Sequence, residues 1–268
     1  MPKLTTIASP VLGNASFLTF LRLDLAAGEI CNLNTEGSEH TLDMLSGVCA
    51  VSVIEAKGQT HVFGAVGGRT DIFSGKPEFV YIPRCCTYTV RCLLGPCEAA
   101  VYTAPTERDS TAHYVTSEAV KVNSAGVSDW KRDIYLGMGE DSPATMMMVG
   151  ETESPPGNWS GFPPHRHTEQ NPPQEQRYEE LYYFKFKPAT GFAVGGIYQD
   201  ASNRPGTAKL LLVEDGQVFD APAGFHFISP CPGYRLRYTW ALGGPGKKFG
   251  AWTVDSDHAW LLNYKEDR

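Results

Sequence analysis

Three histidines and one glutamate in the second half of the chain have the residue types and the spacing of a metal site. His165 and His167 form a His-x-His pair, Glu180 follows, and His226 comes after a Pro222-Ala-Gly turn. On a β-strand, residues i and i+2 point to the same face, so the paired histidines project together. Three neutral imidazoles and a carboxylate suit Zn²⁺, Mn²⁺, Fe²⁺ or Ni²⁺. Such a set leaves one or two coordination positions open for water or substrate, as catalysis requires.

The residues themselves leave two alternatives to this ligand set. If the strand that begins near Glu180 shifts its register by one residue, Glu179 becomes the ligand. If the four side chains do not converge, the histidines are ordinary hydrogen-bonded structural residues. We expect His258 to pack near the C-terminus, beside the site. The proline-rich loop of residues 168–178 lies next to the proposed ligands, and we expect it to act as a lid.

The elements that must position these residues are β-strands. The chain has 27 glycines and 19 prolines, which separate short runs rich in Val, Ile, Tyr, Phe and Thr. This pattern is typical of an all-β sandwich or barrel, and no segment shows a helical apolar stripe over three turns. The expected strands are Phe17–Leu25, Cys49–Glu55, Phe79–Ile82, Tyr88–Cys92, Glu98–Thr103, Met146–Glu151, Glu180–Phe186, Gly191–Tyr198, Leu210–Val213, Gln217–Ala221 and Tyr234–Leu242.

One polar stretch, Ser110–Ser124, has the weakest β pattern in the chain and divides two strand-rich halves of similar length. We therefore predict a boundary near residue 120. This gives an N-terminal domain of residues 1–120 and a C-terminal domain of residues 121–268.

The composition argues against nucleic-acid and membrane partners. A net charge of −7 disfavours binding to nucleic acid or to an anionic membrane surface. No apolar run approaches the roughly 18 residues of a spanning helix, and no secretory signal is visible, so we expect a cytoplasmic protein. The seven cysteines include no Cys-x-x-Cys pair, which predicts reduced and mostly buried thiols.

Several motifs, taken in order, resemble those of the bacterial 5-deoxy-glucuronate isomerases of inositol catabolism, a family related to the 4-deoxy-5-keto-uronate isomerases of pectin breakdown. The motifs are Gly157-Asn-Trp-Ser-Gly-Phe-Pro-Pro-His-Arg-His, Glu179-Glu-Leu-Tyr-Tyr, Gly191-Phe, Pro222-x-Gly-x-His, Pro232-Gly-Tyr and Asp257-His-Ala-Trp-Leu. A weaker match in the first half rests on Phe73-Ser-Gly-Lys-Pro and Val80-Tyr-Ile-Pro. The resemblance covers most of the chain.

The resemblance implies an all-β bicupin, with two β-sandwich (jelly-roll barrel) domains. It carries the metal-ligand roles onto His165, His167, Glu180 and His226, all in the C-terminal domain. The N-terminal domain has no such set and is expected to be a cupin without metal. The implied cofactor is a divalent metal, Zn²⁺ or Mn²⁺ before Fe²⁺ or Ni²⁺. Bicupins commonly self-associate, so we expect a homo-oligomer.

The chain departs from the family pattern near the proposed site. Thr168 stands where the family usually has Asp, Gly195-Gly196 stands in place of Gln-Arg, and Arg237-Tyr-Thr-Trp240 in place of Tyr-Tyr-Leu-Asn. An arginine fork suits the recognition of a carboxylate, so its loss bears on the substrate. Arg235 and Arg237 either replace it or are solvated charges that point outward.

The resulting hypothesis is a metal-dependent aldose–ketose isomerase that converts a deoxy-uronic acid, of the type 5-deoxy-glucuronate to 2-deoxy-5-keto-gluconate. The partner is thus a small sugar acid. Glu179, Tyr182 and Tyr183 are the candidates for proton transfer because they are close in sequence to Glu180. One alternative is a cupin dioxygenase that uses Fe²⁺ and O₂. Another, motivated by Gly195-Gly196 and Trp240, is a non-catalytic protein that binds a sugar acid and keeps its metal.

Overall fold

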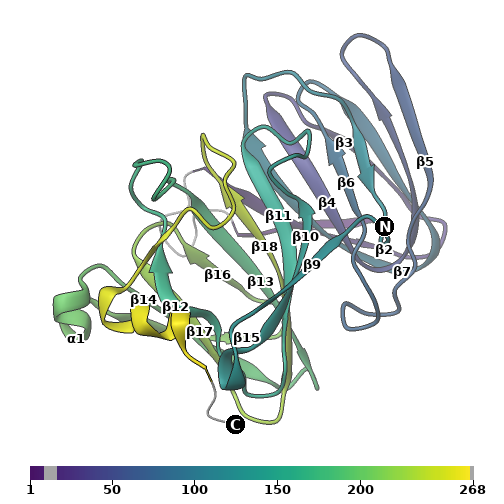
Figure 1. Ribbon diagram of the computed structural model, residues 1–268. Coiled ribbons are helices and arrows are strands. Elements are labelled where there is room, and N and C mark those ends of the chain that lie inside the picture. The colour runs from purple at the N-terminus through teal and green to yellow at the C-terminus, as the bar shows by residue number, and fades with distance from the viewer. Residues whose placement is uncertain (9–16, 266–268) are drawn as a thin grey trace.

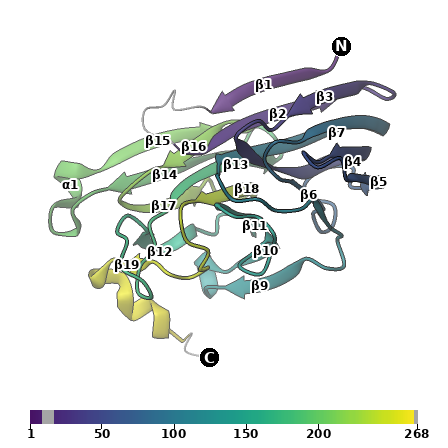
Figure 2. The same cartoon turned by 90° about the horizontal axis from the view of Figure 1, so that it is seen from above.

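The computed structural model describes residues 1–8 and 17–265, which form three antiparallel β-sheets. The first sheet has the order β1-β2-β7-β4-β6-β8, with β3 paired to β7 and β5 paired to β4. The second has the order β16-β13-β18-β11-β10-β9, and the third β15-β14-β17-β12-β19. Figures 1 and 2 show the second sheet between the other two.

The elements have the following bounds. The first sheet contains β1 (Lys3–Ala8), β2 (Thr19–Leu25), β3 (Ile30–Asn34), β4 (Ser38–Ile54), β5 (Thr60–Gly67), β6 (Phe79–Ile82), β7 (Thr87–Pro105) and β8 (His113–Val115). The second contains β9 (Lys121–Ala125), β10 (Arg132–Met138), β11 (Met147–Ser154), β13 (Glu179–Lys187), β16 (Val218–Ala221) and β18 (Arg235–Gly243). The third contains β12 (Ser160–Arg166), β14 (Phe192–Tyr198), β15 (Lys209–Glu214), β17 (Phe225–Pro230) and β19 (Thr253–Val254).

Helical structure is short throughout the described residues. The 3₁₀ segments are η2 (Ser128–Trp130), η3 (Ala201–Asn203) and η4 (Ser256–Asn263), and α1 (Arg204–Thr207) is a single turn. None of these helices is long and apolar enough to span a bilayer.

Two long strands allow the first sheet to fold over on itself. β4 has 17 residues and β7 has 19, and their pairing contains register shifts near Met44, Ser46 and Val48. Such bulges bend and twist a strand, so its two ends can belong to different layers. Residues from both ends of these strands, including Leu42 and Val90, meet in one apolar core. The structure therefore has one continuous strand where the sequence predicted Tyr88–Cys92 and Glu98–Thr103 as two.

The inner strands of the second sheet, β11, β13 and β18, are buried on both faces. On one face, Leu181 and Tyr183 of β13 pack with Phe20 and Tyr102 of the first sheet. On the other face, Tyr182 and its neighbours pack against the third sheet. Because successive strand residues point to opposite faces, the inner strands of this sheet contribute alternately to the two cores.

The predicted all-β bicupin class is confirmed, but the stretch with the weakest β pattern was interpreted wrongly. Ser110–Ser124 contains β8 and most of β9, and the sequence also did not predict β10. β9 is an edge strand whose side chains are almost all exposed, so it lacks the apolar alternation that marks a strand. The predicted boundary near residue 120 falls between β8 in the first sheet and β9 in the second. The division into domains 1–120 and 121–268 stays a prediction.

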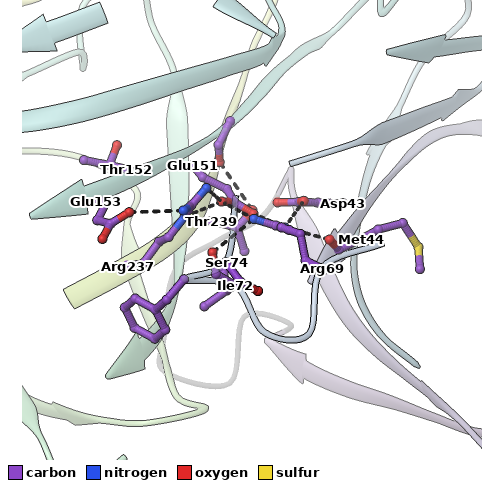
Figure 3. A network of polar contacts seen from close by, with 12 residues as sticks. Asp43, Met44, Arg69, Ile72, Ser74, Glu151, Thr152, Glu153, Arg237 and Thr239 are labelled. Carbon is purple, nitrogen blue, oxygen red and sulfur yellow. Dashed lines mark hydrogen bonds and ion pairs between the residues drawn. The ribbon is translucent and has the colours of Figure 1, made fainter. Parts of the chain in front are cut away.

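A buried ionic network connects the first and second sheets (Figure 3). The Glu151 carboxylate on β11 accepts hydrogen bonds from Arg69 Nη2 at 2.6 Å, from Arg69 Nη1 at 2.9 Å and from Arg237 Nε at 2.6 Å. Burial alone would raise the pKa of Glu151, but the two arginines hold it below its usual range. Asp43 lies 3.6 Å from Arg69 Nη2 on the other side.

Replacement of Glu151 by glutamine should lower the free energy of unfolding by about 3 to 5 kcal/mol, because it leaves two buried guanidinium groups without their shared carboxylate. Urea denaturation at pH 7 measures the change. The matched control is Asp141→Asn, at a carboxylate in an exposed ion pair with Lys121, where we expect a change of about 0.5 kcal/mol or less. A loss below about 1 kcal/mol for Glu151→Gln would contradict the role of the network.

Candidate metal centre

The two sheets of the C-terminal half supply the proposed ligands from opposite sides. His165 on β12 is the cross-strand partner of His226 on β17, and their ring centroids lie 4.8 Å apart. His167 follows β12 directly, two residues after His165, and its ring lies 5.0 Å from that of His226. Glu180 comes from β13 in the facing sheet. A strand pair in one sheet and a single strand in the other thus bring the four side chains together.

The four side chains converge on one point. One ring nitrogen from each of the three histidines lies within 4.8 Å of the others. Glu180 Oε2 lies 2.9 Å from His167 Nε2 and 3.3 Å from His226 Nε2. His226, His167 and Glu180 are buried, whereas His165 is partly exposed at the wall of a cavity. The side chains therefore do not lie apart, as the alternative of separate structural histidines requires, and their role as metal ligands stays a prediction.

The hydrogen bonds of the three rings orient one nitrogen of each toward this point. The Nδ1 atoms of His165, His167 and His226 lie 3.1, 2.8 and 3.2 Å from the backbone carbonyl oxygens of Pro163, Tyr178 and Gly224. A carbonyl oxygen only accepts, so each Nδ1 carries a proton and Nε2 is the ring nitrogen that each histidine can offer to a metal. Buried His226 Nε2 has no hydrogen-bond partner among the described residues, which a cation would supply.

The electrostatics of the cluster also fit a cation. Burial alone would raise the pKa of Glu180, but the adjacent imidazoles of His167 and His226 hold it far below its usual range, so the carboxylate is ionised. Burial, together with the neighbouring histidines, lowers the pKa of His165 to about 3. Burial also disfavours the charged form of His167, yet Glu180 raises its pKa, so a proton and a metal compete there. The donor set fits a divalent cation.

A cavity of about 210 Å³ adjoins this centre. Its wall is mostly apolar and includes several aromatic rings, with a few polar groups. The wall includes Arg132, Tyr182, Tyr238, Trp240 and Trp252. Apolar walls with a few placed polar groups are typical of sites for small molecules.

The alternation of β13 separates the three residues that we expected to transfer protons. Tyr182 faces the cavity with Glu180, and burial raises its pKa well above the usual value, so its hydroxyl stays protonated. Glu179 instead accepts hydrogen bonds from the backbone nitrogens of Phe17 and Leu18, at 3.0 and 2.6 Å. The Tyr183 hydroxyl donates to Glu98 Oε1 at 2.8 Å. The expectation was therefore wrong for Glu179 and Tyr183, which lie on the face of the second sheet that contacts the first.

The positions that depart from the family pattern have physical explanations. A Cβ at Gly195 would meet the ring of Phe219, and one at Gly196 the ring of Phe227, so aromatic rings fill the space of side chains there. The Thr168 hydroxyl accepts a hydrogen bond from Gly224 N at 2.9 Å and so connects the loop to the turn before His226.

Neither interpretation offered for Arg237 was right. Arg237 is buried and bound to Glu151 on the face of the second sheet that is turned away from the cavity, so it is neither a solvated charge nor a replacement for the family's arginine. Arg235 is partly exposed and paired with Glu153, also away from the cavity.

The loop of residues 168–178 is held at several points. The Glu175 carboxylate accepts hydrogen bonds from the backbone nitrogens of Thr168 at 2.7 Å and Glu169 at 2.8 Å, and from the Thr253 hydroxyl. Tyr178 N donates to His167 O at 2.8 Å. The function of this loop as a lid stays a prediction.

The sequence did not reveal Arg132, the cationic side chain of the cavity wall. It stands at the start of β10, a half-exposed strand without a clear period, next to no recognised motif. No signal in the sequence distinguishes it from the other arginines.

Comparisons with known proteins agree with this geometry. The model of the KduI/IolB family matches residues 4–261. The chain belongs to the KduI/IolB family. Among curated relatives, the 5-deoxy-glucuronate isomerase of Geobacillus kaustophilus is 31% identical over 90% of this chain and 84% of its own length. That of Halalkalibacterium halodurans is 27% identical over 96% of this chain and 93% of its own. The prediction of an enzyme of the isomerase class is thus confirmed.

Solved structures confirm the fold. An IolB-like protein from Salmonella typhimurium superposes with a TM-score of 0.87 and 25% identity, over 96% of this chain and 98% of that one. The oxalate decarboxylase of Lactobacillus farciminis, at 13% identity and a TM-score of 0.67 over 98% of this chain and 86% of its own, shares the fold.

Substitution of His226 by alanine should reduce the affinity for a divalent metal by at least about 100-fold, since loss of a ligand exceeds the effect of losing an outer hydrogen bond. Metal content after dialysis measures this, and circular dichroism checks the fold. His258→Ala is the matched control, because His258 packs on Phe162, with 6.0 Å between the ring centroids, and is not in the cluster. Equal metal content in wild type and His226→Ala would overturn the ligand assignment.

Proposed function

We propose that this protein is a metal-dependent aldose–ketose isomerase that acts on a deoxy-uronic acid of the 5-deoxy-glucuronate type, as in inositol catabolism. The observation that carries the proposal is the convergence of one ring nitrogen from each of three histidines with Glu180, beside a mostly apolar cavity. The names of the curated relatives support the substrate class. The proposed metal is Zn²⁺ or Mn²⁺, held by His165, His167, Glu180 and His226, with Fe²⁺ or Ni²⁺ as substitutes. A cytoplasmic location and self-association stay predictions.

The reaction moves a carbonyl group from C1 to C2 of an open-chain sugar acid. A proton leaves C2, a proton is added to C1, and negative charge develops on the two oxygens in between. A bound divalent cation supplies Lewis-acid stabilisation for that charge. The residues of the chain bind and orient the sugar, exclude water and hold protons.

Tyr182 is the proposed proton-holding group of the cavity. Its phenol stays protonated because burial raises its pKa, so it donates a hydrogen bond rather than acting as a base at neutral pH. A donor fixed near the oxygens of the substrate stabilises the charge that develops there. Trp240 and Trp252 line the same cavity and exclude water, which strengthens this interaction.

The proposed activity is tested with purified protein loaded separately with Zn²⁺, Mn²⁺, Fe²⁺ or Ni²⁺ and supplied with 5-deoxy-glucuronate. We expect formation of the keto acid without uptake of oxygen, because isomerisation has no external oxidant. Product is followed by NMR and oxygen by an electrode. Consumption of O₂ with Fe²⁺ would indicate the dioxygenase alternative, and absence of product with all four metals would reject this substrate.

Tyr182→Phe should lower kcat by about 10²- to 10³-fold, the usual effect of removing one hydrogen-bond donor from a developing oxyanion, while metal content is retained. The matched control is Tyr183→Phe, because the hydroxyl of Tyr183 binds Glu98 on the other face of the sheet. Steady-state kinetics and metal analysis of both variants decide the matter. The role of Tyr182 is refuted if both phenylalanine variants retain the wild-type kcat.

A further inference from the structure

Arg132 is a cation on the wall of the cavity whose donors are only partly used by the protein. Its Nη1 atom donates to the carbonyl oxygens of Trp130 at 3.2 Å and Phe162 at 3.0 Å. Within residues 1–8 and 17–265, Nε and Nη2 make no hydrogen bond, and they are not among the polar atoms shut off from solvent. The two backbone contacts thus fix the guanidinium group and leave one edge of it, with at least two N–H donors, directed to accessible space.

The surroundings of Arg132 differ from those of the other enclosed arginines. Arg69 and Arg237 share the Glu151 carboxylate, at 2.6 Å in each case. For Arg132, no carboxylate lies within ion-pair distance among the described residues. Burial lowers its pKa, and the neighbours that oppose this are phenols, Tyr238 and Tyr182, rather than acids.

An arginine that is partly buried without a nearby carboxylate is unfavourable, because the charge loses part of its hydration and gains no counterion. Guanidinium cannot escape by deprotonation at neutral pH. A bound anion would supply the missing partner, and the free edge of the fork matches the two oxygens of a carboxylate.

We infer that Arg132 is the carboxylate-recognition residue of this cavity. It binds the acid group of the substrate, while the carbonyl end of the sugar lies at the His165, His167, Glu180 and His226 centre, which lines the same cavity. The Tyr238 hydroxyl, which lies 2.6 Å from Ser160 Oγ, borders the carboxylate subsite. The inference rests on the proposed function for the identity of the sugar. It explains how a uronate is recognised although Gly195-Gly196 stands where the family has Gln-Arg.

The test compares an acid with its neutral counterpart. The metal-loaded protein is titrated with 5-deoxy-glucuronate and with the analogue that has CH₂OH in place of the carboxylate, and binding is followed by calorimetry. Wild type should prefer the acid. Arg132→Gln should weaken binding of the acid by about 10- to 100-fold and leave binding of the neutral sugar within about twofold, because only the charged hydrogen bonds are lost. Arg132→Lys, which keeps the charge without the fork, should lie between the two.

Arg91→Gln, at an exposed arginine on β7, is the matched control and should bind both sugars as wild type does. Metal content and thermal unfolding show whether Arg132→Gln keeps its fold. If it does not, the binding of the acid and of the neutral sugar is compared in Arg132→Lys instead. An unchanged preference for the acid in the intact variants, equal weakening of both sugars, or no preference in wild type would overturn the inference. If the preference depends on Arg132 but wild type forms no keto acid, the carboxylate subsite stands and the proposed reaction fails.

Discussion

The burial of both faces of the second sheet is the constraint on which the site depends. A strand with one solvated face needs apolar residues only on its other face, at every second position. β13 and β18 instead pack against a sheet on each face, so both alternating sets of side chains must fit a neighbour. Even-numbered residues of β13 face the cavity and the third sheet, and odd-numbered residues face the first sheet. The same alternation that brings Glu180 and Tyr182 to the cavity places Glu179 and Tyr183 on the opposite face, where they bind residues of the N-terminal half. A shift by one residue would exchange these sets and destroy both the core and the centre.

The charges enclosed within the protein follow two different rules. Between the sheets, Arg69 and Arg237 share the Glu151 carboxylate, and Arg237 also pairs with Glu153. In the cavity, buried His226 Nε2 has no hydrogen-bond partner among the described residues, and Arg132 has no acidic neighbour that offsets its burial. A ligand or ion in the cavity would supply these partners. The shared carboxylate of the junction and the open donor groups of the cavity thus distinguish the structural part of the second sheet from the part that faces a small molecule.

The N-terminal half contributes to the site indirectly. Its long bent strands form a packed core of their own and present Phe20 and Tyr102 to the second sheet. The carboxylate of Glu39 accepts hydrogen bonds from Thr145 N at 2.7 Å and Met146 N at 2.8 Å, at the start of β11. The first sheet therefore fixes the outer face of the sheet that carries Glu180 and Tyr182, which stiffens the centre from behind.

The sequence by itself determined the all-β class, the family and the four candidate ligands, because each depends on local information. The spacing of His165 and His167 fixes their common direction on any strand, and the motifs occur in family order. Only the tertiary structure decided which face of β13 meets the cavity, that Arg237 is buried at the junction, and that Arg132 reaches the cavity wall. These facts depend on which sheet covers which face, and that is set by contacts between residues far apart in the chain. An alternating strand has the same pattern whichever way it is turned, so its sequence does not carry that information.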